Sequence, residues 1–146
     1  ISQMAPSKSH PVRLQLSGGD VQLAGDRGKL RQLIENIGGN AVKYSPTGGA
    51  IKVRGALRKE HYVLQVIDQG IGMTAEQAER VFEKFYRADY GNTAISGIGL
   101  GMSIVQRIVQ THGGLVRVKS KPGCGTRVTV FLPRLAASSD SVEARR

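Results

Sequence analysis

The stretch SGIGLGMSIV, residues 96–105, places glycines at the alternate positions 97, 99 and 101, and an amphipathic helical pattern begins directly behind them. Glycine permits positive φ and lets another group approach the backbone closely. A helix N-terminus adds free N–H groups and a partial positive charge. The combination indicates a place where phosphates are held, and the rest of the chain decides which kind of phosphate site it is.

The composition around this stretch is that of a soluble globular protein. The 146 residues are enough for one domain with a core, and 40% of them are hydrophobic and 22% charged. No apolar run approaches the length of a membrane span. Cys124 is the only cysteine, which excludes an intrachain disulfide and agrees with a reducing compartment. With three scattered histidines, a structural zinc site is not expected.

The formal net charge of +10 raises the question of a nucleic-acid partner. No block of adjacent basic residues occurs, and only three Phe and four Tyr are available to stack on bases. The basic residues are spread along predicted strands and tails, for example at Lys52, Arg54, Arg117, Lys119 and Lys121. We therefore expect a solvated surface or a phosphate-rich ligand, and no nucleic acid.

Three segments divide the chain. Residues 1–10 are polar and contain Pro6, and we predict that they form a linker from an upstream region. Residues 11–133 are predicted to form the domain, and residues 134–146 a disordered tail. Ile1 is not an initiator methionine, so we expect the chain to be a piece of a longer protein.

Hydrophobic periodicity predicts a mixture of strands and helices. Alternation indicates strands at residues 12–16, 21–24, 51–54, 62–67, 115–119 and 126–132, with a loop at 55–60 closing a hairpin. Helical spacing indicates one helix from the N-cap Asp26 to about Lys43, and another from a capping box at Thr74 to about Phe85. A third helix has Leu100, Ile104, Val105, Ile108 and Val109 along one face and is terminated by His112, Gly113 and Gly114. We predict an α+β fold of two layers, with about three helices on one face of a mixed, mostly antiparallel sheet.

Three polar side chains of the first helix share one stripe. Asn36, Asn40 and Lys43 fall at i, i+4 and i+7, and Tyr44 follows them. Two amide oxygens and an ammonium group can serve a magnesium ion and a phosphate, because Mg²⁺ prefers hard oxygen ligands and keeps several waters. On the pattern alone, a solvent-exposed polar stripe is the better explanation of these residues.

Asp68 ends a strand-like run and is followed by Gly70 and Gly72. Alternation places its carboxylate on the same side as Leu64 and Val66, beside the core. A carboxylate there can accept a hydrogen bond from an exocyclic amine such as that of adenine, and the two glycines leave room for a flat ring. The alternative is an ordinary aspartate in a strand-to-loop turn.

Five segments, in this order, resemble the sequence boxes of sensor histidine kinases. The resemblance covers about residues 14–133, and the segments carry the N, G1, F, G2 and last glycine boxes: NIGGNAVKYSP at 36–46, DQGIG at 68–72, FEKFYR at 82–87, GIGLG at 97–101, and GCGT at 123–126 before LP at 132–133. The resemblance implies the Bergerat ATP-binding fold, which gyrase B, MutL and the heat-shock chaperone ATPases share. Dinucleotide and P-loop sites are excluded, because the glycines of the G2 box follow a polar loop and no Gly-Lys-Ser/Thr ending is present.

The resemblance also implies roles for individual residues. Asn40, supported by Asn36, would coordinate Mg²⁺ that bridges the ATP phosphates, and Lys43 would neutralise phosphate charge. Tyr44 would lie near the adenine, whose amine Asp68 would bind. The adenine side of the site would also include Gly70, Gly72 and Thr126.

The remaining implied roles fall on the second half of the site. The loop from Arg87 to Ser96 would be the ATP lid, behind Phe85, and we infer that Arg87 reaches the γ-phosphate. Gly97 would begin the phosphate-binding turn. Backbone N–H groups of Gly99, Leu100 and Gly101 would bind the phosphates.

One position separates the subfamilies. Gyrase- and MutL-like ATPases carry a glutamate four residues before the magnesium-binding asparagine, and here that position is Asn36. Glu35 is adjacent but about 100° around the helix, so we expect it not to reach the same spot. Water attack on the γ-phosphate should then be slow, which suits a domain that transfers the phosphoryl group to another acceptor.

The acceptor is predicted to lie outside this chain. In the family the phosphorylated histidine lies on a dimerisation helix beside an acidic residue, and His10, His61 and His112 lack that setting. We expect His10 in the polar lead-in, and a structural role for His112 at a helix end. The resemblance then implies the parent's dimerisation domain and a response regulator as partners, a monomeric isolated domain, and a cytoplasmic location within a membrane-anchored parent. An anti-sigma-factor serine kinase of the same fold and a non-catalytic nucleotide-binding scaffold remain the alternatives.

Overall fold

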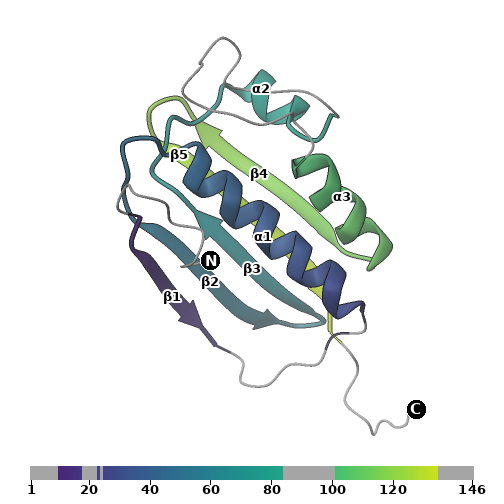
Figure 1. The fold of residues 1–146 in the computed structure, drawn as a ribbon. Coiled ribbons are helices and arrows are strands. Elements are labelled where there is room, and N and C mark those ends of the chain that lie inside the picture. Colours follow the sequence, from purple (N-terminus) through teal and green to yellow (C-terminus); the bar gives the residue numbers. More distant parts are fainter. Residues whose placement is uncertain (1–9, 18–22, 24, 84–100, 135–146) are drawn as a thin grey trace, which may run out of the picture.

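The computed structural model describes residues 10–17, 23, 25–83 and 101–134. Five strands and three helices follow one another along this part of the chain (Figure 1). Their bounds are β1 Val12–Leu16, α1 Arg27–Lys43, β2 Ile51–Arg58, β3 His61–Ile67, α2 Ala75–Arg80, α3 Gly101–Thr111, β4 Leu115–Lys121 and β5 Gly125–Pro133. Within these residues no helix is long and apolar enough to cross a membrane.

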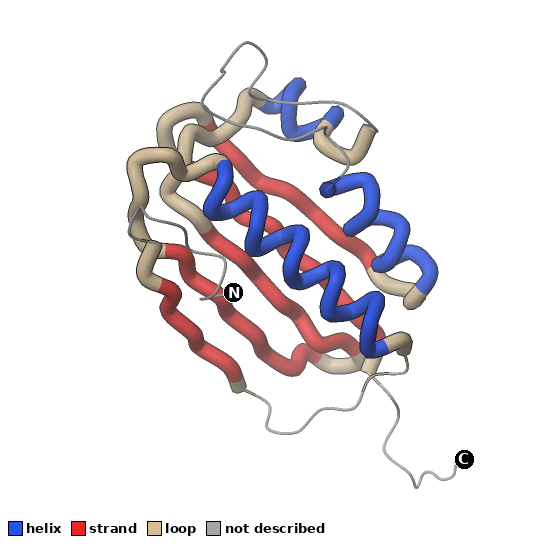
Figure 2. The backbone as a smooth tube through the Cα atoms, in the orientation of Figure 1, coloured by secondary structure: helices blue, strands red, loops and turns tan. Residues whose placement is uncertain are grey.

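The five strands form one sheet in the order β1-β2-β3-β5-β4. Strand β1 pairs with β2 in parallel, and the other three pairs are antiparallel. Helices α1 and α3 lie side by side against one face of this sheet (Figure 2). The predicted two-layer α+β architecture, with a mixed and mostly antiparallel sheet, is therefore confirmed.

Helix α1 forms where its N-cap and its apolar spacing predict it. The Asp26 carboxylate accepts a hydrogen bond from the Lys29 N–H at 3.1 Å and so satisfies one of the free donors of the first turn. Leu33, Ile37 and Ala41 are buried on the face that meets the sheet. The polar stripe that contains Asn36 and Asn40 lies next to this buried face on the helix.

His112 joins the start of α1 to the end of α3. Its Nδ1 lies 2.7 Å from the Ile108 carbonyl oxygen, and its Nε2 lies 3.1 Å from the Asp26 backbone nitrogen. Since a carbonyl only accepts, Nδ1 carries the proton and Nε2 accepts from the Asp26 N–H. His112 thus has the structural role at a helix end that we predicted, at the termini of α1 and α3 that lie away from Gly101.

Two predicted boundaries are wrong for local reasons. Strand β2 continues through Gly55 to Arg58, and the hairpin turns at Lys59 and Glu60 alone. A Cβ atom at Gly55 would collide with the Tyr62 ring, so the glycine serves close packing inside the strand and not a loop. Helix α2 has the predicted capping box but ends at Arg80. Beyond it, the N–H groups of Val81 and Glu83 donate to carbonyls three residues back instead of four.

The predicted polar lead-in is wrong at His10. This side chain is only 4% exposed, and its Nε2 lies 2.8 Å from the Ser45 carbonyl oxygen just beyond α1. Of the strand predicted at residues 21–24, only Leu23 is described, in an isolated bridge to Arg134. The predicted linker at residues 1–9 and the tail at 135–146 lie outside the described residues.

Candidate functional site

A cavity of about 400 Å³ opens between α1, the first turn of α3 and the ends of β3, β4 and β5. Its volume lies in the range of small-molecule sites. Eight residues that the sequence analysis assigned to a site line it: Asn36, Asn40, Lys43, Tyr44, Asp68, Gly72, Gly101 and Thr126. Segments far apart in the sequence therefore converge on one place.

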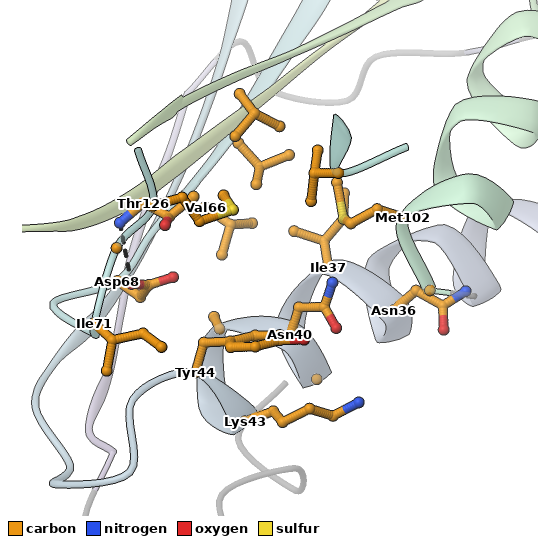
Figure 3. A pocket seen from close by; sticks show the side chains of 18 of the residues that line it. Asn36, Ile37, Asn40, Lys43, Tyr44, Val66, Asp68, Ile71, Met102 and Thr126 are labelled. Atoms are coloured by element: carbon orange, nitrogen blue, oxygen red, sulfur yellow. Dashed lines mark hydrogen bonds between the residues drawn. The ribbon is translucent and has the colours of Figure 1, made fainter. Parts of the chain in front are cut away.

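Asp68 forms one end of the cavity, where it is 7% exposed (Figure 3). Its Oδ1 accepts hydrogen bonds from the Gly70 N–H at 2.9 Å and the Thr126 N–H at 3.1 Å. Burial nevertheless raises the pKa of the carboxyl to about 6, because desolvation outweighs the two hydrogen bonds. Within the described residues Oδ2 has no hydrogen-bond partner, so it is available to a ligand that donates a proton.

The hydroxyl of Ser120 holds the Asp68 side of the cavity together. It accepts from the Met73 N–H at 2.8 Å and donates to the Gly125 carbonyl at 2.9 Å. Its single proton is then used, so the Thr126 hydroxyl, 2.8 Å away, donates to it. Thr126 therefore presents oxygen lone pairs, and no free proton, to the cavity. The sequence analysis missed Ser120, which is one small polar residue in an alternating strand.

The opposite end of the cavity is polar and faces α3. Asn40 lies between Asp68 and Asn36 in Figure 3, and a Cβ atom added to Gly101 would lie 3.4 Å from Asn40 Oδ1. Asn36 Nδ2 is buried without a hydrogen-bond partner among the described residues. Lys43 adds an ammonium group at the rim, and α3 begins at Gly101 with its N-terminus toward this end. Unpaired amides, a cation and a helix N-terminus favour a negatively charged group.

An apolar wall lies between the two polar ends. It includes several residues that the sequence analysis did not assign to the site: Ile71, Met73, Val81, Met102, Ile104, Val118 and Val128. The available signal was the alternation of β4 and β5, which places Val118 and Val128 on the inner face as directly opposed partners. Such a wall suits a flat, weakly polar ring.

The two glycines after Asp68 serve different purposes. Gly72 lines the cavity at φ +71°, and a Cβ atom there would collide with the Lys121 carbonyl. Gly70 is not among the lining residues of the cavity. A Cβ atom at Gly70 would collide with the Tyr44 carbonyl, so this glycine lets the loop pass close behind α1.

Glu35 also lines the cavity. Gly39, one turn further along α1, lines it too, and a Cβ atom there would meet nothing within 4 Å. Five other predicted site residues, Phe85, Arg87, Gly97, Gly99 and Leu100, lie outside the described residues.

Residues 25–136 match the family of histidine kinase-, DNA gyrase B- and HSP90-like ATPases. The chain is 38% identical over 117 residues to the sensor-like histidine kinase SenX3 of Mycobacterium tuberculosis, covering 80% of this chain and 28% of SenX3. It is 39% identical over 117 residues to the sensor histidine kinase WalK of Bacillus subtilis, covering 78% of this chain and 19% of WalK. The chain thus spans less than a third of the length of these relatives.

Solved structures agree with this assignment. The mycobacterial sensor histidine kinase MprB matches with a TM-score of 0.75 at 31% identity, over 86% of both chains. Full-length ShkA in complex with AMPPNP matches with a TM-score of 0.78 at 30% identity, over 93% of this chain and 28% of ShkA. The chain belongs to the histidine kinase-, DNA gyrase B- and HSP90-like ATPases, as a catalytic ATP-binding domain of the sensor histidine kinase type.

Proposed function

We propose that this chain binds magnesium-ATP in the cavity and donates the γ-phosphoryl group to a histidine on a separate dimerisation domain. The observation that carries the proposal is the polarity of the cavity. One end offers the unpartnered Oδ2 of Asp68, and the other offers two amides, Lys43 and the N-terminus of α3. A molecule with a flat amine-bearing ring and a polyphosphate chain matches both ends.

The adenine ring fits the Asp68 end. Its exocyclic amine donates to Oδ2, while Oδ1 stays occupied by the backbone of Gly70 and Thr126. Tyr44 and the apolar wall cover the faces of the ring and exclude water. Hydrogen bonding inside such a dry site discriminates strongly between bases, because a mismatched polar group is left unpaired.

The Asn36–Asn40 end fits a magnesium ion that is held partly by the nucleotide. Within the described residues no group of three or more His, Cys, Asp or Glu could hold a metal. Neither amide has a side-chain hydrogen bond to a described residue, so Asn40 Oδ1, and Asn36 after an amide flip, are free hard-oxygen ligands. The bound ion would neutralise charge on the phosphates, and Lys43 would add to this effect.

Phosphoryl transfer then depends on positioning. Asn36 stands where the ATPases of the family carry their water-activating glutamate, and it cannot accept a proton. We propose that water therefore attacks slowly, and that an imidazole nitrogen brought to the γ-phosphate is the faster acceptor. Backbone N–H groups at 99–101 and the Arg87 side chain complete this end in our proposal.

The histidines of the chain are engaged in other ways. His10 contacts the Ser45 carbonyl, His112 joins α1 to α3, and His61 begins β3 opposite Arg58 and Pro133. None of the three lines the cavity. We therefore propose that the acceptor is supplied by the parent's dimerisation domain, that a response regulator receives the phosphoryl group next, and that the parent is a membrane-anchored sensor with this domain in the cytoplasm.

Phosphotransfer in trans tests the proposal. The chain is incubated with γ-labelled magnesium-ATP, alone and with a histidine-bearing dimerisation helix pair of a sensor histidine kinase. We expect little label on the chain and acid-labile label on the helix pair, as a phosphohistidine gives. Acid-stable label on a serine would favour the serine kinase alternative.

Glu35 supplies the control for water attack. Replacing it, Glu35→Gln, should leave the slow ATP hydrolysis by the isolated chain unchanged. Rapid hydrolysis that is lost in Glu35→Gln would contradict the proposal and identify an ATPase with Glu35 as its general base.

A further inference from the structure

The face of the sheet that points away from the helices is strongly basic. Strand register places eight cationic side chains on it and no Asp or Glu: Arg13, Lys52, Arg54, Arg58, Arg117, Lys119, Lys121 and Arg127. We call this surface the basic face. Without these eight charges the formal net charge of the chain would fall from +10 to +2, so one surface accounts for most of it. In the sequence, Lys52, Arg54, Arg117, Lys119 and Lys121 look scattered, because basic residues alternate with others along each strand.

These charges are not balanced by the fold. Among the described residues the only ion pair is Arg80–Glu83, which lies in the helical layer. Two like-charged pairs even stand directly opposite each other, Arg13 with Lys52 and Lys119 with Arg127. Like charges in directly opposed positions destabilise a sheet. An arrangement that costs stability in the isolated chain points to an anionic partner.

We propose that the basic face is a docking surface for an anionic lipid bilayer. Its charges are spread over β1, β2, β5 and β4, with the uncharged middle of β3 between them, so a broad planar partner meets all of them at once. Each Lys or Arg near an anionic membrane surface adds to the attraction, which fades within a Debye length. The cavity opens in the helical layer, so docking leaves the nucleotide site accessible.

Other partners fit this surface less well. A nucleic-acid duplex takes a helix or ribbon into a groove, and a single strand needs exposed aromatic rings. Among the described strand residues, Phe131 is the one Phe, Tyr or Trp on the basic face, and the Arg117 guanidinium covers it at 5.6 Å from the ring centroid. A second copy of this chain gathers only three acidic residues on α2 and its following turn, Glu76, Glu79 and Glu83, and Arg80 interrupts them. A bilayer therefore matches the observations best.

Vesicle binding with charge-matched variants tests the proposal. The double variant Lys52→Glu with Arg127→Glu turns both like-charged pairs into opposite-charged pairs. The control, Arg31→Glu with Arg107→Glu, makes the same change in net charge at exposed positions of α1 and α3. Binding is measured to phosphatidylcholine vesicles with and without phosphatidylglycerol at physiological ionic strength.

We expect the wild-type chain and the control to bind only the anionic vesicles, and the basic-face variant to bind at least about tenfold more weakly. The basic-face variant should also melt at the same or a higher temperature and keep its ATP affinity. If it fails to fold, Lys52→Gln with Arg127→Gln replaces it. Equal losses in both double variants, no binding of the wild type, or tighter binding to a single-stranded oligonucleotide than to vesicles would each overturn the proposal.

Discussion

The Asp68 carboxyl group is buried beside the apolar wall, and in the part of the chain that the structure describes only one of its oxygens has hydrogen-bond partners. Its pKa of about 6 means that the folded protein resists ionising it. At neutral pH the group is charged and its burial is unfavourable. We expect a bound ligand to compensate for this cost through a hydrogen bond to Oδ2. The group that lowers the folding stability is then the group that binds the ligand.

The variant Asp68→Asn should therefore change the pH dependence of stability. In the folded protein the pKa of the Asp68 carboxyl is raised from 3.8 to about 6. Rising pH therefore destabilises the folded state through this group. The effect is small below pH 4 and complete above pH 6. Between pH 4 and pH 8 the wild type should lose about 2 kcal/mol that Asp68→Asn does not lose. Urea unfolding of both proteins at the two pH values measures the difference. A difference between the proteins that is constant with pH would contradict the buried, titrating carboxyl.

Asn40 is the residue on which the magnesium assignment depends. Its amide has no hydrogen bond to a described residue, so Asn40→Ala should cost little stability. The variant should bind ATP at least about tenfold more weakly when Mg²⁺ is present, because a hard-oxygen ligand is lost. Calorimetry with and without EDTA measures this, and Gln110→Ala on the exposed side of α3 is the control. Equal affinities of Asn40→Ala and the wild type for magnesium-ATP would contradict the assignment of Asn40 as a ligand of the ion.

At the scale of elements, the cavity depends on how three segments are fastened to one another. The loop after β3, strand β4 and the start of β5 meet at the Ser120 hydroxyl, which uses its one proton and both lone pairs. The loop carries Asp68 to Met73, and Thr126, the second residue of β5, lies next to it. We therefore propose that Ser120 is a positioning residue for the Asp68 end of the cavity, where we place the adenine, although it does not line the cavity.

Replacing that hydroxyl, Ser120→Ala, leaves the Met73 N–H and the Gly125 carbonyl without their partner. We expect a loss of about 1–3 kcal/mol in unfolding free energy and a several-fold weaker ATP affinity. Ser17→Ala also removes a hydroxyl, but an exposed one near Gly55, and should leave both quantities nearly unchanged. Full ATP affinity in Ser120→Ala would show that the adenine end is positioned without this network.

At the scale of the whole molecule, local signals predicted the elements and long-range contacts decided the rest. The Asp26 cap and the apolar spacing behind it predicted α1, and alternation through Val66 predicted the inward direction of Asp68. The hairpin was misplaced because Gly55 reads as a loop residue unless its contact with Tyr62, across the strand pair, is known. The order of the strands and the apolar wall depend on pairing between distant segments, which a single sequence does not specify.

The basic face and the burial of His10 both depend on contacts between segments that are distant in the sequence. Alternation along each strand contained the information that all eight cations share a face, but only the register of four strand pairs joins them into one surface. His10 lies in a polar stretch and is buried because the Ser45 carbonyl, 35 residues away, provides its partner. Both are properties of the assembled fold.

The central claim is that the adenine of ATP binds with its amine at Asp68 Oδ2, and the ratio of the affinities for ATP and GTP tests it most directly. In Asp68→Asn the amide oxygen keeps the Gly70 and Thr126 hydrogen bonds, so the amide nitrogen points into the cavity as a donor. It then opposes the amine of adenine and matches the carbonyl of guanine. Calorimetry of both magnesium-nucleotides should show a preference of the wild type for ATP, and a shift of about 10- to 100-fold toward GTP in Asp68→Asn. An unchanged ratio of the two affinities would contradict the account.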